Sequence, residues 1–145
     1  MRKTLVVVGL LVLAGVGRVA AHHAFTAEFD ANAPVNLKGE VIKVDWVNPH
    51  AWIHMDVKGA DGKVERWAIE QGSPNALIRQ GWGRTTIQPG TIISVQGFRS
   101  IDGSPKAAGR QVTLADGKRL FSGSPEAAAG AQTGKPAAGG AAYKD

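Results

Sequence analysis

The stretch that decides the fold comprises residues 51–71, with the sequence AWIHMDVKGADGKVERWAIEQ. At its start every second residue is small or apolar, which is the period of a strand with one buried face: Ala51, Ile53, Met55 and Val57. The segment Gly59-Ala60-Asp61-Gly62 then predicts a hairpin turn. The strand expected to return from it, Val64 to Gln71, carries Trp67 and Ile69 on its apolar face. The stretch therefore predicts two antiparallel strands.

A longer strand is expected just before this hairpin. Between Leu37 and Trp46 the apolar positions change from one face to the other near Gly39-Glu40-Val41. One extra residue in a strand produces such a change, so the pattern predicts a β-bulge. The pair Asn48-Pro49 then ends the strand.

One short helix is expected after the hairpin. Ser73 is a helix-capping residue, Pro74 suits the first helical position, and Gly81 is a typical stop. Between Pro74 and Gly81 the chain holds the helix-compatible run Ala76-Leu77-Ile78. These features together predict a single helix of about two turns.

Beyond Pro89-Gly90 the strand pattern returns in residues 91–98 and 110–121, and Asp116-Gly117 would divide the second run into a hairpin. The expected order is three strands, one short helix, and two or three further strands. An OB-fold, a five-stranded Greek-key barrel, has this order. We therefore expect a mainly β fold, a small OB-like barrel of five to six strands. A small open β-sandwich is the alternative.

The amino-terminal residues 1–21 have the composition of a secretory signal peptide. Two basic residues precede an apolar run of 12 residues, and spanning a bilayer takes about 20. Val19 and Ala21 provide the small residues that favour cleavage after Ala21, so the mature protein is expected to begin at His22. We expect a periplasmic or secreted protein with no stable membrane anchor.

The carboxyl-terminal residues 124–145 are expected to form a disordered tail. Alanine and glycine make up 12 of these 22 residues, and large apolar side chains are scarce. Such a segment cannot bury enough surface to offset the entropy lost on ordering. Residues 22–123, about a hundred in all, remain for the OB-like domain.

The charge balance argues against a nucleic-acid partner. The full chain has a net charge of +5. Removal of residues 1–21 takes away Arg2, Lys3 and Arg18, which lowers the 17 positive side chains to 14 against 12 negative ones and the net charge to +2. A concentrated basic face is then not expected. The chain has no cysteine, which excludes disulfides and thiolate metal sites.

The four histidines are the candidates for a metal site. A free amino-terminal histidine such as His22 can bind a metal through its amine and its ring nitrogen, and nitrogen ligands suit Cu(II). His50 and His54 would lie about 13 Å apart on one strand, too far to share an ion. We predict a copper site formed by His22 and His50, with His23 or Asp30 nearby. The alternative is that His22 and His23 only begin a frayed terminus.

A second class of function is binding at an exposed aromatic face. Trp46 and Trp67 share faces with apolar residues and are expected in the core. Trp52 is expected on the opposite, solvent-facing side, where a carbohydrate, an envelope polymer or a protein partner could bind. The predicted ligand-binding residues are Trp52, His54, Arg66 and Glu70.

Catalytic motifs give no support for an enzyme. The chain has no nucleophile elbow, no zinc-protease motif and no phosphate loop, and Gly81-Trp82-Gly83 lacks the third glycine of a dinucleotide turn. Carboxylates are plentiful, but no spacing selects an acid and base pair. We assign no catalytic residue, and copper is the one cofactor that the sequence points to.

Several segments resemble a known family: His22-His23-Ala24-Phe25, Asn48-Pro49-His50, Gly72-Ser73-Pro74-Asn75 and Gly81-Trp82. With them the chain resembles a family of small exported bacterial proteins catalogued as domain of unknown function 6152. The resemblance covers nearly all of the mature chain up to about Ser122. It implies export and a single β-rich domain, and it implies no activity.

Overall fold

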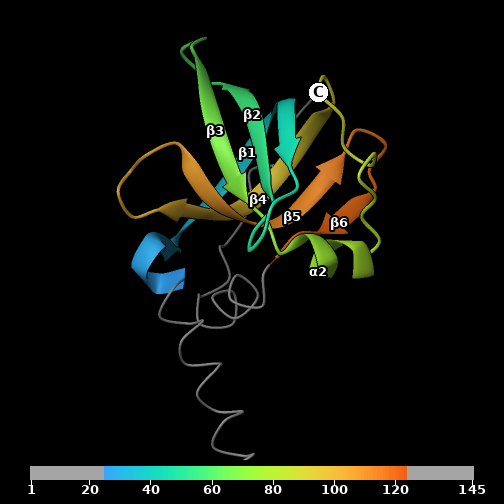
Figure 1. The fold of residues 1–145 in the computed structure, drawn as a ribbon. Helices are drawn as coiled ribbons and strands as arrows, with labels where there is room; N and C mark the ends of the chain where they lie inside the picture. Colours follow the sequence, from blue (N-terminus) through green and yellow to red (C-terminus); the bar gives the residue numbers. More distant parts are fainter. Residues whose placement is uncertain (1–24, 124–145) are drawn as a thin grey trace, which may run out of the picture.

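The computed structural model describes residues 25–123, so the expected signal peptide, His22, His23 and the expected tail lie outside the described residues. The described part is mainly β, with six strands, one labelled helix and a helical turn at residues 25–28 (Figure 1). The elements in chain order are β1 (Phe29–Asp45), β2 (Trp52–Lys58), β3 (Val64–Glu70), α2 (Pro74–Arg79), β4 (Ile92–Ser100), β5 (Lys106–Leu114) and β6 (Arg119–Phe121). No helix in this part of the chain is long and apolar enough to span a bilayer.

The strand pairings form a closed series. β1 pairs with β2 on one side and with β4 on the other, β2 pairs with β3, and β4 pairs with β5, all antiparallel. A short parallel pairing of β3 with β5 links the two ends of this series. β6 pairs with β5 and extends the sheet outside the ring (Figure 1). Five strands thus form a ring of hydrogen-bonded neighbours.

The long strand β1 belongs to both halves of the ring. Its register with β2 shifts between Val41 and Lys43, which confirms a bulge close to the predicted position. Gly39 lies where β1 pairs with both neighbours, and a Cβ at this position would clash with the Asp56 carbonyl. A glycine is therefore required for the close approach of β1 to β2.

The core is built from alternate residues of the strands, as the period of two predicts. Its fully buried side chains include Val41, Ile53, Met55, Ile69, Ile93, Val95 and Val112. Leu77 of α2 also contributes to this cluster, as does Trp82, whose Nε1 donates to the Phe121 carbonyl at 2.8 Å. The predicted helix is confirmed: the Ser73 hydroxyl accepts from the Ala76 amide, and Gly81 has a φ of +90°.

Two expectations need correction at the amino-terminal end of the domain. The turn at residues 25–28 is a second helical segment in addition to the one expected, and β1 begins at Phe29 rather than at Leu37. A small aromatic cluster explains both differences. Phe25 and Phe29 pack with Phe98 of β4, at ring-centroid distances of 5.8 Å (Phe25 to Phe29) and 5.9 Å (Phe25 to Phe98). The contact between Phe25 and Phe98 joins residues that are distant in the sequence, so no local pattern reveals it.

Strand β5 also begins earlier than expected, at Lys106 rather than at Arg110. Its first three residues pair with β3, and the second and third of them, Ala107 and Ala108, also pair with β4. Pairing on two sides stabilises an extended conformation for Ala107 and Ala108, two residues that favour strands little by themselves.

Candidate functional site

His50, the predicted ligand within the described residues, lies in the connection between β1 and β2. Two backbone hydrogen bonds hold this connection against the end of β3. The Gln71 amide donates to the Ala51 carbonyl at 2.8 Å, and the Ala51 amide donates to the Gly72 carbonyl at 3.2 Å. His50 is therefore placed beside the last residue of β3, Glu70.

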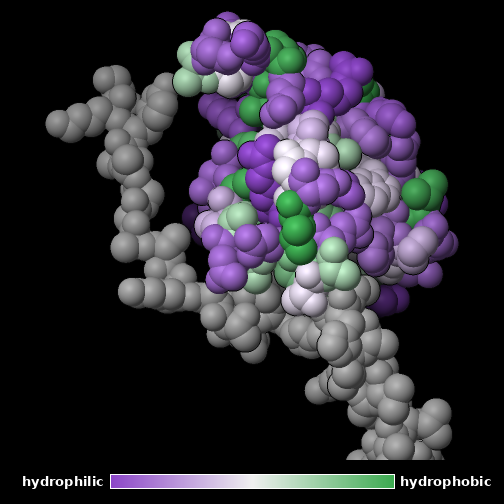
Figure 2. All heavy atoms as spheres, turned by 90° about the vertical axis from the view of Figure 1, so that its left-hand side faces the viewer, coloured by the Kyte–Doolittle hydropathy of each residue, from purple (hydrophilic) through white to green (hydrophobic). Residues whose placement is uncertain are grey.

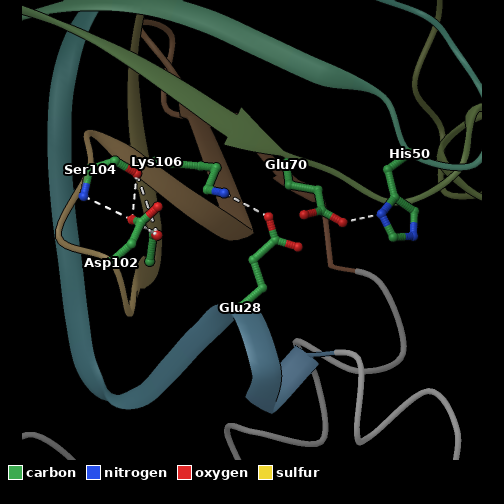
Figure 3. Close-up of polar contacts among 7 residues, drawn as sticks. Glu28, His50, Glu70, Asp102, Ser104 and Lys106 are labelled. Carbon is green, nitrogen blue, oxygen red and sulfur yellow. Dashed lines mark hydrogen bonds and ion pairs between the residues drawn. The ribbon is translucent and has the colours of Figure 1, made fainter.

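His50 and Glu70 form an ion pair between the ring Nδ1 and the carboxylate Oε1 (Figure 3). The Glu70 side chain is only 12% exposed, whereas that of His50 is 40% exposed. A carboxylate on Nδ1 fixes the orientation of the ring and leaves Nε2 as the ring nitrogen free to accept a proton or bind a metal. The more exposed partner of this pair is thus the imidazole ring.

Glu70 lies in an environment that disfavours its charge. Burial is the largest influence and raises the pKa of Glu70 above its ordinary value, and the nearby charge of Glu28 acts in the same direction. His50 and Lys106 oppose this rise, because each can place a positive charge near the carboxylate. The net result is a carboxyl group whose pKa is raised.

A second ion pair lies next to the first. Lys106 Nζ of β5 is 2.7 Å from Glu28 Oε1 of the helical turn, and it lies 5.8 Å from the centroid of the Phe29 ring. The hydrogen bond with Glu28 raises the pKa of Lys106. Figure 3 shows the carboxylates of Glu28 and Glu70 facing each other between Lys106 and His50. We refer to Glu28, His50, Glu70 and Lys106 as the polar cluster.

The loop between β4 and β5 borders the polar cluster. Asp102 accepts hydrogen bonds from the Ser104 amide at 2.9 Å, from the Ser104 hydroxyl at 2.6 Å and from the Ser100 hydroxyl. These bonds hold the pKa of Asp102 far below its ordinary value. The loop is thereby ordered directly before Lys106 (Figure 3).

Sequence reasoning found half of the polar cluster. His50 and Glu70 are among the predicted site residues, although they were assigned to different sites, copper and the Trp52 face. Glu28 and Lys106 were not predicted as site residues, because they come together only through the aromatic cluster and the start of β5. No local pattern links two residues that lie 78 positions apart.

The other predicted metal ligands are not brought together in the described part of the chain. His22 and His23 lie outside it. Asp30 accepts a hydrogen bond from the Asn32 amide at 2.8 Å. Within residues 25–123, no three His, Asp or Glu side chains are grouped so that they could hold a metal ion by themselves.

The predicted Trp52 face lies on the outward-facing side of β2 and β3. Trp52 lies directly opposite Glu70, and His54 opposite Ala68, on the side of the β2–β3 pair that faces away from the core. Its polar side chains already have partners. Arg66 binds Asp56 through two hydrogen bonds of 2.8 and 3.0 Å. His54 Nε2 is 3.0 Å from Asp45 Oδ2.

The side of the domain at the left of Figure 1 is predominantly hydrophilic, with its hydrophobic residues in separate small groups (Figure 2). Broad apolar patches are the usual mark of a protein interface. Small separate groups of surface hydrophobic residues are ordinary in folded proteins.

Comparison with protein families identifies the relationship of the chain. A family model described as a family of unknown function, DUF6152, matches residues 10–110, which is more than half of the 145 residues. The chain belongs to the DUF6152 family. The resemblance seen in the sequence is therefore confirmed. The matched range of DUF6152 includes the whole polar cluster, from Glu28 to Lys106. No curated protein matches the chain.

Proposed function

We propose that this DUF6152 protein is an exported copper-binding protein in which the mature amino-terminal His22 and the His50 ring hold Cu(II). The observation that carries the proposal is the pairing of His50 Nδ1 with Glu70. Histidines that bind metals usually donate their other ring N–H to a carboxylate, a backbone carbonyl or water. The residues fit this ion because copper(II) favours nitrogen ligands and His50 presents an exposed one.

Chain connectivity supports the approach of His22 to this nitrogen. Phe25 is buried in the aromatic cluster, and His22 precedes it by only three residues. Three residues span at most roughly 10 Å, so this length would allow His22 to lie near the helical turn. That turn also carries Glu28, which lies close enough to Glu70 to influence its pKa. His22 would supply its amine and ring nitrogens, with His23 or Asp30 as further neighbours.

The barrel fold and the export of the protein are also part of the proposal. We infer that the ring of strands is a small OB-like barrel, supported by the pairing of β3 with β5 and by the position of α2 between β3 and β4. Export to the periplasm or medium is supported by the composition of residues 1–21. The disordered tail at residues 124–145 stays a prediction.

The test combines the intact mass of the secreted protein with Cu(II) titration. Mass spectrometry should give a chain that begins at His22. The native protein should bind Cu(II) at least about tenfold more tightly than a version with one extra residue before His22, since that residue displaces the amine from its position beside the ring. His50→Ala should weaken binding similarly, and His54→Ala is the matched control. Equal affinity of all four proteins would overturn the proposal.

The second candidate is binding of a carbohydrate, an envelope polymer or a protein partner at the Trp52 face. The half-buried position of Trp52, directly opposite Glu70, favours it. Quenching of tryptophan fluorescence by such a ligand in metal-free protein, lost in Trp52→Phe, would support this candidate over copper.

A further inference from the structure

The strands β1, β4, β5 and β6 are successive neighbours in the sheet (Figure 1). Two rows of side chains cross these four strands. In each row every residue lies directly opposite the next in the strand registers. The first row is Asn36, Gln96, Gln111 and Phe121, and the second is Lys38, Ser94, Thr113 and Arg119. We call the surface formed by these eight residues the amide face.

Both rows point away from the core. The row between them consists of Leu37, Val95, Val112 and Leu120, which belong to the core cluster. Because successive side chains of a strand alternate between its two faces, the rows on either side must face outward. Asn36 and Gln96 are exposed, and the Phe121 ring is 46% exposed.

The amide face carries unused hydrogen-bonding capacity. Within the part of the chain that the structure describes, the side-chain amides of Asn36, Gln96 and Gln111 bond to no other protein group. Asparagine is depleted in strands, and amide–amide pairs are not among the cross-strand pairs known to stabilise sheets. An amide side chain offers two donors and one acceptor to a ligand.

We propose that the amide face binds an N-acetylated glycan chain. An acetamido group offers one N–H and one C=O, so it can pair reciprocally with the amide of Gln96 or Gln111. Neighbouring strands lie about 4.8 Å apart, close to the length of one β-linked sugar unit, so a chain lying across the strands places one unit over each amide. Phe121 at the sheet edge presents an aromatic ring to the apolar face of a sugar.

Isothermal titration with the N-acetylglucosamine tetramer tests this inference on the full mature protein. A chelator is included, so the result is independent of copper. The wild-type protein should bind the tetramer, and the double variant Gln96→Ala/Gln111→Ala should bind it at least about tenfold more weakly, because two amides lose their hydrogen bonds. Gln88→Ala, which removes an exposed amide from the turn before β4, is the matched control and should bind like the wild type.

The double variant Gln96→Met/Gln111→Met keeps the length of both side chains without their amides and should lose affinity to the same degree, which separates recognition from folding. Absence of tetramer binding by the wild-type protein would overturn the inference. Equal binding of dextran, which has no acetamido groups, would also overturn it. A third contrary result would be loss of binding in Trp52→Ala with full binding in the glutamine variants, since the site would then be the Trp52 face.

Discussion

Glu70 and His50 form an ion pair that joins the end of β3 to the connection between β1 and β2. The carboxylate is almost buried and the imidazole is half exposed, so the pair links the edge of the core to solvent. This relationship unites two residues that sequence patterns assign to separate sites.

The pH dependence of stability should contain a contribution from Glu70. Its pKa in the folded protein is raised above the ordinary value of 4.5, so the folded state binds the Glu70 proton more tightly than the unfolded state. This contribution favours folding at low pH and is lost as the pH rises from about 4.5 through the folded pKa. In Glu70→Gln the contribution should be absent. Urea unfolding at a series of pH values measures the difference.

Glu65→Gln is the matched control for this series, because it neutralises an exposed carboxylate on the same strand. Its stability should follow the wild-type pH profile. A wild type that gains stability relative to Glu70→Gln as the pH rises through this range would contradict the assignment.

Gly39→Ala should destabilise the protein by about 1–3 kcal/mol, the range for overpacking at a tight position. The added Cβ would clash with the backbone carbonyl of Asp56, and backbone atoms in a paired strand cannot move aside easily. Gly72→Ala is the control, because the nearest atom to its Cβ would be 3.5 Å away, an ordinary contact. Chemical unfolding of the two variants should show a clear loss only at Gly39.

Phe25→Ala should lower the free energy of unfolding by about 2–3 kcal/mol. This loss is at or below the lower end of the range for a buried phenylalanine, because only the small aromatic cluster loses contacts. It should also reduce hydrogen-exchange protection of the Ile101 amide, which donates to the Glu28 carbonyl. Phe121→Ala, at a half-exposed ring, should cost less than about 1 kcal/mol. Equal losses in the two variants would show that Phe25 does not anchor the turn.

The ion pair between Arg66 and Asp56 should add little to stability despite its two hydrogen bonds. The Arg66 side chain is 63% exposed, and solvent screens the attraction. In a double-mutant cycle, the effects of Arg66→Ala and Asp56→Ala on the free energy of unfolding should be nearly additive. A strong coupling between the two substitutions would mean that the Trp52 face is shielded from water.

Local patterns were sufficient for most elements of the fold. The alternation in residues 51–71 predicted β2 and β3 and their buried faces, because a residue's face in a strand depends only on its position within a period of two. Ser73, Pro74 and Gly81 likewise marked α2, since capping involves neighbours in the chain. The start of β1 and the turn at residues 25–28 escaped prediction because Phe98 holds them from a distant strand.

The candidate sites show the same distinction between features set by local sequence and features set by tertiary contacts. Composition and residue type alone pointed to His50 and to Trp52, since each is a chemically distinctive side chain beside or within an expected strand. The polar cluster and the amide face depend on registers between strands that are distant in the sequence: Glu28 meets Lys106, and Asn36 aligns with Gln96 and Gln111. Such registers follow from which buried faces pack together, so only the tertiary structure decides them.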